Sequence, residues 1–544
     1  TNVLETTFRT RTGTVRVVDC MPVTLEAEKR KRLWPDRDLL RIIEGVEGEV
    51  ELEITCAPRP DYGRVTPILR DRGALGFYYD HEARALILRS DIPLRLSEEH
   101  SLVTGRARIR PGQRAAVHLV QSEQEIAILP ALGAEAERQL ERSLAWWGEW
   151  AARCRYQGPW REQVIRSALT LKLMCFAPSG AVVAAPTTSL PEALGQSRNW
   201  DYRYCWLRDA SLTLQALFDL GYPQEAAAFV SWLLHTTGIT RPELQILYDI
   251  YGESHLRERK LGYLAGYAGS RPVRVGNAAH DQLQLDVYGE VIDAVYEFVS
   301  RGGRLDRPAA RMLRGWGDTV LRRWTEPDEG IWEIRCGRRQ HTFSKAMCWI
   351  AVDRLIRLAE EGHLRLDLTG YRSARDAIQQ AIESQGFDAG LGSYVSEFGG
   401  RELDASLLLL DRLGYVEPAS ERMAGTYRQI EERLGHNGLL YRYRADDGIN
   451  CGEGAFGVCS FWAVSYLARA GRLPEAERLF EHLLGFANDV GLYAEEIDPD
   501  NGGALGNFPQ AFTHVGLIDA ALTMEQCRGG RPRGAEPQEA KTLI

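Results

Sequence analysis

The chain has 544 residues, of which 44% are hydrophobic and 26% are charged, proportions typical of a globular protein with a substantial core. This length allows roughly two to four domains. The formal net charge is −9, and Lys and Arg are interspersed among Asp and Glu, which argues against nucleic-acid binding and against a basic membrane-binding patch. No apolar run reaches roughly 18 residues, so we expect no membrane span. No signal peptide opens the chain, but residue 1 is Thr, and we expect an N-terminal piece to be missing.

Ten cysteines are scattered along the chain without a Cys-x-x-Cys pair. Cys175, Cys348 and Cys459 lie within apolar helical runs. This distribution is typical of small buried side chains rather than of a disulfide framework or a zinc site, and it favours a cytoplasmic protein. Metalloprotease, nucleotide-binding and serine-hydrolase motifs do not occur, so we expect no cofactor.

Residues 1–128 are predicted to form an antiparallel β-sandwich. Residues 6–10 and 15–18 flank Thr12-Gly13, which is the signal of a hairpin. Residues 49–54 alternate strictly between charged and apolar side chains, as a half-buried strand does. Similar patterns follow at residues 85–88 and 115–120, with turn signals between them. No titratable cluster stands out in this region, so we expect its role to be structural.

The spacing of apolar residues changes from that of strands to that of a helix after residue 128. Residues 133–153 are rich in Ala, Glu and Arg, with Leu140, Leu144, Trp147 and Trp150 near helical spacing, which predicts a linker helix within residues 129–156. Residues 157–530 are predicted to be helical and residues 531–544 to form a C-terminal tail. Twelve helical segments are expected in the helical region, near residues 159–176, 207–220, 223–237, 278–301, 306–325, 343–362, 368–386, 404–413, 417–434, 453–471, 474–487 and 508–527.

Two regularities in these twelve segments predict how they pack. The even-numbered segments are apolar nearly all round, as at residues 347–352 and 407–410, whereas most odd-numbered segments carry a charged face, as at residues 475–481. Odd-to-even connectors span roughly 17 to 40 residues and even-to-odd connectors about 2 to 5, and long loops are uncommon unless functional. Buried and covering helices that alternate in this way close into a double ring. The predicted fold is therefore mainly α, an (α/α)6 barrel catalytic domain after the N-terminal β-sandwich, with its site where the long loops emerge.

Candidate catalytic carboxylates occur in two of the long loops. Gly330-Ile331-Trp332-Glu333 lies in the fifth-to-sixth link, and an indole beside a carboxyl raises its pKa by disfavouring the charged form. Glu495 and Glu496 lie in the last long link. Glycosidic bond cleavage needs a protonated acid and a second carboxylate across the sugar ring, so these loops could supply both groups.

The first long link ends in a segment that combines aromatic rings with charge. Residues 199–209 include Tyr202, Trp206, Arg208 and Asp209. Sugar sites use flat rings against the apolar face of a pyranose and charged groups for bidentate hydrogen bonds to hydroxyls. This segment is therefore a candidate sugar-binding wall.

Each candidate also has a purely structural interpretation. Arg208 and Asp209 could form an ion pair at a helix start, where Asp is favoured. Glu495 and Glu496 could belong to a solvated acidic loop. Asp404, directly before an apolar run, is typical of a helix N-cap.

Three more residues stay ambiguous. Glu453 lies near the start of the tenth segment and could be a cap or a ligand. His341 and His514 are expected to be histidines with satisfied hydrogen bonds, which are commoner than catalytic ones.

Taken together, these stretches resemble bacterial members of glycoside hydrolase family 15, the inverting glucoamylases and related glucosidases, including some trehalases. The resemblance covers nearly the whole chain and is densest at residues 198–209, 276–290, 330–345 and 495–516. In that family the general acid follows the Trp of a Trp-Glu motif, which implies Glu333. The general base is the first Glu of the last long loop, which implies Glu495. The family's Arg-Asp pair, which holds the non-reducing-end glucose, corresponds to Arg208 and Asp209.

The resemblance further implies that Tyr202 and Trp206 are neighbours of the site, and we expect Trp332 and Glu496 to contribute to substrate binding. Two departures are notable. Fungal glucoamylases carry a second acidic residue after the general acid, where this chain has Ile334, so the choice of substrate beyond the scissile bond is open. Bacterial relatives also begin earlier, with sandwich strands that this chain lacks.

The favoured hypothesis is an exo-acting, inverting α-glucosidase that releases glucose from non-reducing ends. Glu333 would protonate the glycosidic oxygen while Glu495 deprotonates a water on the opposite face of the ring, with the two carboxyls roughly 6.5–9.5 Å apart.

One alternative is a glycoside phosphorylase, in which phosphate replaces the base and water and cationic groups stand where Glu495 stands. Another is a non-catalytic carbohydrate-binding protein, which needs no opposed carboxylates. Maltodextrin, isomaltose-type glucans and trehalose all present an α-glucosyl unit, and the sequence leaves this choice and the oligomeric state open.

Overall fold

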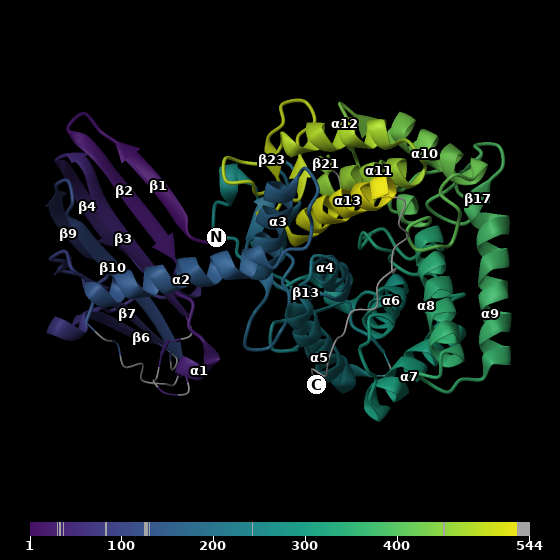
Figure 1. The fold of residues 1–544 in the computed structure, drawn as a ribbon, viewed down its shortest axis with the longest axis horizontal. Helices are drawn as coiled ribbons and strands as arrows, with labels where there is room; N and C mark the ends of the chain where they lie inside the picture. Colours follow the sequence, from purple (N-terminus) through teal and green to yellow (C-terminus); the bar gives the residue numbers. More distant parts are fainter. Residues whose placement is uncertain are drawn as a thin grey trace. The chain divides into compact units, whose positions relative to one another are not determined.

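The computed structural model describes residues 1–529 except residues 30, 32, 33, 36, 82, 83, 124–128, 130, 242, 450 and 451. By its internal contacts the chain forms two compact units, Thr1–Arg153 and Cys154–Ile544, each of which is described by itself (Figure 1). The four-part division expected from the sequence stays a prediction, and its tail at residues 531–544 lies outside the described residues. None of the helices in the described part is both long enough and apolar enough to span a bilayer.

The first unit is an antiparallel β-sandwich with a helix on one sheet. Its larger sheet has the strand order β1-β2-β3-β10-β7-β6-β5, and its smaller sheet has the order β4-β9-β8. The hairpin predicted around Thr12-Gly13 is confirmed, because β1 and β2 pair antiparallel there. The strands are β1 (Leu4–Arg9), β2 (Gly13–Cys20), β3 (Arg37–Gly48), β4 (Val50–Cys56), β5 (Arg70–Asp71), β6 (Phe77–His81), β7 (Arg84–Ser90), β8 (Arg95–Leu96), β9 (Val103–Ile109) and β10 (Arg114–Glu123), with the short helices α1 (Glu26–Lys29), η1 (Pro60–Gly63) and η2 (Gly73–Leu75) between them.

Side chains of strand β3 alternate between its two faces, and each face packs into a different core of this unit. Ile43 packs with Ile109 of the smaller sheet in the core between the sheets. Its neighbour Ile42 points to the other face and packs with Leu140 of α2 (Ala134–Ala152). Successive side chains of a strand point to opposite faces, so one apolar strand serves both cores. The predicted helix at residues 133–153 therefore covers the outer face of the larger sheet.

The second unit contains a closed inner ring of helices. Each member packs against the next, and the last packs against the first. Residues 207–217 of the first member are all buried, as expected for a segment that is apolar nearly all round. In chain order the ring consists of α4 (Leu207–Asp219), α6 (Asp286–Ser300), α8 (Thr342–Glu360), the 3-10 helix η6 (Ala405–Leu409), α11 (Gly457–Arg469) and α13 (Ala511–Gly529).

In the described part of this unit, six outer helices cover this ring (Figure 1). Most of them are amphipathic: the buried residues of α9, for example, are Tyr371 and Ile378 alone among its described residues. The alternation of buried and covering segments confirms the predicted (α/α)6 barrel. The outer helices are α3 (Arg161–Met174), α5 (Pro223–Thr240), α7 (Arg307–Arg323), α9 (Leu368–Ala381), continued by a π-helical turn (Ile382–Gly386), α10 (Glu421–Leu434) and α12 (Leu473–Leu484).

Two predicted helices differ from the observed ones. The segment expected at residues 278–301 divides into a 3-10 turn, η4 (Ala278–Asp281), and α6. Between them the N–H groups of Leu283 and Leu285 donate to the carboxylates of Glu329 and Asp328, at 2.8 and 2.9 Å, instead of continuing the helix. The segment expected at residues 404–413 is only the short η6.

Long links run from each outer helix to the next inner helix, at residues 175–206, 241–285, 324–341, 387–404, 435–456 and 485–510. Short antiparallel ladders and 3-10 turns stiffen them. One ladder joins β13 of the first link to β14 of the second, so that separate links hold one another in place. These elements are β11 (Thr188–Pro191), β12 (Asn199–Asp201), β13 (Cys205–Trp206), β14 (Leu247–Tyr248), β15 (Arg259–Lys260), η3 (Tyr267–Gly269), β16 (Arg274–Val275), β17 (Phe387–Asp388), β18 (Ser393–Tyr394), β19 (Gly435–His436), β20 (Leu439–Leu440), β21 (Ala455–Phe456), β22 (Glu496–Ile497) and β23 (Ala504–Leu505).

The cysteines largely follow the expectation. The nine described ones are free, and Cys348 and Cys459 are buried in the inner ring. Cys336 and Cys527 are exposed, contrary to the prediction of small buried side chains.

Candidate active site

Two adjoining cavities lie where the long links meet, and five of the six links contribute to their walls. The space between their walls, counted together with the open solvent at their mouths, is about 370 Å³ in the first and about 400 Å³ in the second. Four residues belong to both walls: Tyr202, Trp332, Glu333 and Arg442. The first cavity is also lined by Ala184, Trp206, Arg208, Asp209, Ile331, Phe456, Gln510 and Phe512, and the second by Arg198, Trp200, Asn277, Ile334, Arg335, Tyr443, Asp447 and Ile449.

Glu333 lies at the junction of the two cavities. Its side chain is 21% exposed, and its carboxylate accepts a hydrogen bond from the indole N–H of Trp206 at 2.7 Å. The backbone of Glu333 has a φ of +61°, a left-handed conformation that is rare for residues other than glycine and clusters at functional sites. Burial raises the pKa of Glu333, and the charge of Arg208 and the Trp206 hydrogen bond oppose that rise. The environment therefore favours a proton on this carboxyl, as an acid catalyst requires.

Trp332 holds the loop that carries Glu333. Its indole N–H donates to both carboxylate oxygens of Asp404, each at 2.9 Å. Asp404 also accepts from the backbone N–H of Ser406 at 2.7 Å and so caps η6, as predicted from the sequence. Its second role, as the anchor of Trp332, is one that the sequence did not indicate.

Arg208 and Asp209 form a buried ion pair in the first turn of α4. Arg208 Nε and Nη2 lie 3.1 and 3.0 Å from Asp209 Oδ2. Arg208 also donates to the carbonyl of Ile331, two residues before Glu333. Burial raises the pKa of Asp209, and the charge of Arg208 opposes that rise. The pair is thus both a helix-start ion pair and part of the cavity wall.

Glu495 lies directly behind the wall of the first cavity. Its side chain is fully buried, and it accepts hydrogen bonds from the hydroxyl of Tyr202 at 2.6 Å and from the N–H of Asn507 at 3.2 Å. A Cβ atom on Gly506 would lie only 2.5 Å from its Oε2 atom, so glycine leaves the room that this carboxylate occupies. Burial and the charge of Glu192 raise the pKa of Glu495 to about 8, against the opposing hydrogen bond from Tyr202.

Glu496 points to the other side of its strand, as neighbouring residues of an extended segment do. Its Oε2 atom accepts from the N–H of Gly454 at 2.7 Å. Its Oε1 atom lies 3.9 Å from Arg442 and has no hydrogen-bond partner among the described residues. Burial and the charges of Glu192 and Glu453 raise its pKa well above the usual range. Neither Glu495 nor Glu496 is among the residues that line the two cavities, so the substrate contact expected for Glu496 stays a prediction.

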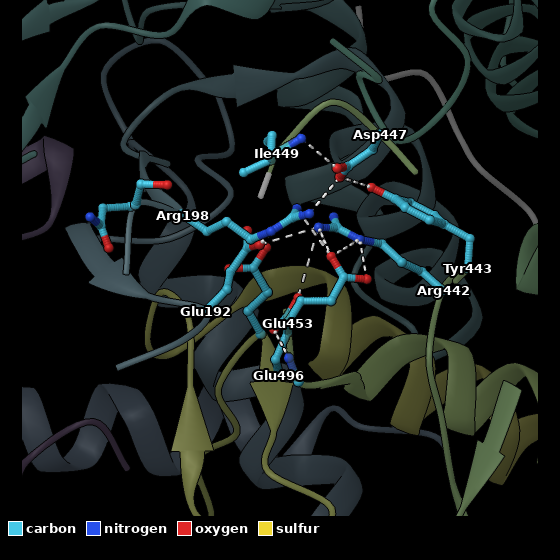
Figure 2. A network of polar contacts seen from close by, with 12 residues as sticks. Glu192, Arg198, Arg442, Tyr443, Asp447, Ile449, Glu453 and Glu496 are labelled. Atoms are coloured by element: carbon cyan, nitrogen blue, oxygen red, sulfur yellow. Dashed lines mark hydrogen bonds and ion pairs between the residues drawn. The ribbon is translucent and has the colours of Figure 1, made fainter. Parts of the chain in front are cut away.

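Beyond Glu496 lies a buried network that sequence reasoning missed (Figure 2). Arg442 Nη2 lies 2.6 Å from Glu453 and 3.2 Å from Glu192. Arg198 Nη1 lies 3.2 and 3.6 Å from the same two carboxylates. Glu453, ambiguous in the sequence, is therefore a partner of two arginines. Arg442 could have been found from its position between Tyr441 and Tyr443 in a long link, which is the same mixture of rings and charge as in residues 199–209.

Oxygens of Glu192, Glu453 and Glu496 lie within 4.8 Å of one another, a spacing that could hold a cation. Arg198 and Arg442 already bring positive charge to these carboxylates. We therefore interpret the cluster as an ion-pair network.

The two ambiguous histidines differ. His514 accepts from the N–H of Tyr493 at 3.2 Å through Nε2, and its Nδ1 lies 3.0 Å from the hydroxyl of Ser167. It is a structural histidine that holds the loop before Glu495. His341 Nε2 has no hydrogen-bond partner among the described residues, contrary to the expectation of a satisfied ring.

Residues 158–522 match the sequence model of the family described as "Glycosyl hydrolases family 15". The chain belongs to glycoside hydrolase family 15. A trehalase of Mycolicibacterium smegmatis is 37% identical over an alignment of 545 positions, which covers 96% of this chain and 80% of the relative. A trehalase of Thermoplasma volcanium is 34% identical over 530 residues, covering 97% of this chain and 83% of the relative. The family and these relatives identify the protein as a glycoside hydrolase.

The fold of this family 15 enzyme is also that of a solved structure. A bacterial glucoamylase complexed with acarbose matches 96% of this chain and 86% of its own, with a TM-score of 0.68 and 14% sequence identity. At that identity the likeness concerns the fold alone. This match confirms the predicted barrel architecture, and the family model confirms the predicted family.

Proposed function

We propose that the enzyme hydrolyses α,α-trehalose with inversion at one anomeric carbon. The observation that carries the proposal is that Glu333 belongs to the shared wall of two cavities of similar volume. A disaccharide with one ring in each cavity has its linking oxygen at this wall. The names of the M. smegmatis and T. volcanium relatives support trehalose as that disaccharide.

Glu333 donates its proton to the linking oxygen, and the bond from that oxygen to the anomeric carbon in the first cavity breaks. Glu495 takes a proton from a water that attacks the same carbon from the opposite face, so an O–H bond breaks as the new C–O bond forms. Arg208 and Asp209 hold the hydroxyls of the ring in the first cavity. Two features support Glu495 as the base: its carboxylate has two hydrogen-bond donors, and Tyr202, which supplies one of them, lines the cavity.

The products distinguish this mechanism from its rivals. Inversion yields one β-glucose, from the ring that water attacks, and one α-glucose, from the leaving ring. Retention would yield α-glucose alone. A cytoplasmic location, expected from the cysteine pattern, stays a prediction.

The test is a substrate panel of trehalose, maltose, isomaltose and soluble starch, with early products followed by proton NMR. We expect trehalose to have the highest kcat/KM and to release the two anomers in equal amounts. Faster cleavage of maltose or starch would exclude a trehalase, and α-glucose alone would exclude inversion. Phosphate-dependent formation of glucose 1-phosphate would make the enzyme a phosphorylase.

A further inference from the structure

The second cavity has a buried ion pair of its own, between Arg198 and Asp447 (Figure 2). Arg198 Nη2 lies 2.6 Å from Asp447 Oδ2, and both side chains are at most 6% exposed. The two residues come from different long links, the first and the fifth, and lie 249 positions apart in the sequence. The barrel therefore builds a charged pair into a cavity wall from two distant segments.

Asp447 is held as a carboxylate. The hydroxyl of Tyr443 donates to its Oδ2 atom at 2.8 Å, and the N–H of Ile449 donates to its Oδ1 atom at 3.0 Å. Burial raises the pKa of Asp447, but the hydrogen bonds from Tyr443 and Arg198 outweigh burial and keep that pKa below its usual range. An ionised, buried carboxylate beside a guanidinium offers an acceptor and a donor in one fixed geometry.

This arrangement repeats that of the first cavity. There, Arg208 and Asp209 form a buried pair with a separation of 3.0 Å. Glu333 belongs to both walls, so each of the two Arg–Asp pairs shares a cavity with the same carboxyl. An apolar wall would suffice for a leaving group of any kind, whereas a charged pair in the wall adds hydrogen bonds only to ligands whose hydroxyls reach it. Asp447 Oδ1, which accepts from the N–H of Ile449, has a second lone pair to offer.

We propose that Arg198 and Asp447 determine specificity for the leaving glucose by binding its C4 and C6 hydroxyl groups, both of which are free when that ring is linked through its anomeric carbon. The proposal rests on the trehalase activity proposed above. In trehalose both rings are linked through C1, so the leaving ring has free hydroxyls at C4 and C6. In maltose the leaving ring is substituted at C4, and in isomaltose at C6. Each of these isomers therefore leaves part of the pair unmatched, and trehalose satisfies it fully.

The test variant is Asp447→Asn, which keeps the shape of the side chain and removes its charge. Arg198 stays in place, because its removal would leave Glu192 and Glu453 short of a partner in a buried site. Asp446→Asn is the matched control: it makes the same change one residue earlier, at an exposed side chain. The substrates are trehalose, maltose and α-glucosyl fluoride, whose small leaving group does not fill the second cavity.

We expect Asp447→Asn to lower kcat/KM for trehalose about 10- to 100-fold, the usual effect of weakening a charged hydrogen bond. The values for maltose and α-glucosyl fluoride should fall much less, so that the preference for trehalose over maltose shrinks. Asp446→Asn should leave all three values near those of the parent enzyme. Tyr443→Phe, which removes one donor to Asp447, should change the preference in the same direction by a smaller factor.

Two results would overturn the inference. One is an equal loss on all three substrates, which would mean that Asp447 only supports the fold of the site. The other is an unchanged preference for trehalose in Asp447→Asn and Tyr443→Phe alike. If Asp447→Asn does not fold, Tyr443→Phe decides alone. Failure of the proposed function would look different, because the parent enzyme itself would then prefer maltose or starch to trehalose.

Discussion

Gly506 offers a direct test of Glu495 as the base, because its missing side chain is what gives that carboxylate its place. In Gly506→Ala the new Cβ atom would lie 2.5 Å from Glu495 Oε2, whereas ordinary contacts begin near 3.4 Å. The carboxylate must therefore move by about 0.9 Å, and a misplacement of about 1 Å at a reacting group can cost about 10²-fold in rate. We expect kcat/KM for trehalose to fall by about that factor.

The matched control is Gly502→Ala in the same loop. Gly506 has a φ of +73° and Gly502 a φ of +74°, so alanine meets the same left-handed strain at both, about 1–2 kcal/mol. At Gly502, however, the nearest atom to the new Cβ is a ring carbon of Phe486 at 3.5 Å, an ordinary contact. In Gly506→Ala the new Cβ atom would also lie 2.7 Å from Glu495 Cβ, so thermal unfolding should show a larger loss of stability there than in Gly502→Ala. Steady-state kinetics should show a large loss only in Gly506→Ala. Equal kcat/KM values in the two variants would refute the placement of the base at Glu495.

Glu333→Gln should still bind trehalose, but its kcat should fall about 10²- to 10⁴-fold in a glucose-release assay, with a smaller loss on α-glucosyl fluoride, whose leaving group needs little protonation. Arg208→Ala should raise KM, because it removes a charged hydrogen bond worth about 1.5–3 kcal/mol; an unchanged KM would make the pair a structural feature only. Glu495→Gln should lose most turnover and Glu496→Gln should keep most of it, and the reverse order would move the base by one residue. Asp286→Asn tests pH dependence: burial and a neighbouring aspartate raise the pKa of Asp286 from 3.8 to about 7, so the stability that its proton confers is full below pH 3.8 and is lost as the pH rises to about 7. Urea unfolding should therefore show that Asp286→Asn stabilises the protein more at pH 8 than at pH 4, by at most about 4 kcal/mol, and equal effects at both pH values would contradict this reasoning.

The barrel could be predicted because its signals are local. A segment that is apolar all round, such as residues 407–410, can only be buried, and an amphipathic neighbour must cover it. Segment boundaries were less predictable where distant side chains compete for backbone groups. Leu283 and Leu285 have helical surroundings in the sequence, but carboxylates more than 40 positions away take their N–H groups.

Part of the candidate site could likewise be predicted from local sequence, and part could not. Glu333 could be found from its neighbour Trp332 and its long loop, and the Arg208–Asp209 pair from adjacent letters in the sequence. The network of Arg198, Arg442 and their carboxylates could not be predicted as a network, because its partners are up to 250 positions apart and no local pattern links them. The left-handed backbone of Glu333 was equally invisible, since glutamate has no preference for it.

Glu495 and Glu496 look interchangeable in the sequence, and their surroundings make them different. Arg198 and Arg442 are paired with Glu192 and Glu453, and burial and neighbouring carboxylates raise the pKa values of Glu495 and Glu496, so this doublet retains a proton near neutral pH. Of the doublet, Glu496 is the poorer anion, because its Oε1 atom has no hydrogen-bond partner among the described residues. Glu495 is the better anion, because a hydroxyl and a backbone N–H both donate to it. A proton on Glu496 removes one of the negative charges beside Glu495 and so lowers the cost of ionising it. The neighbour of the proposed base is then the group that holds the shared proton, and this leaves Glu495 free to accept one from water.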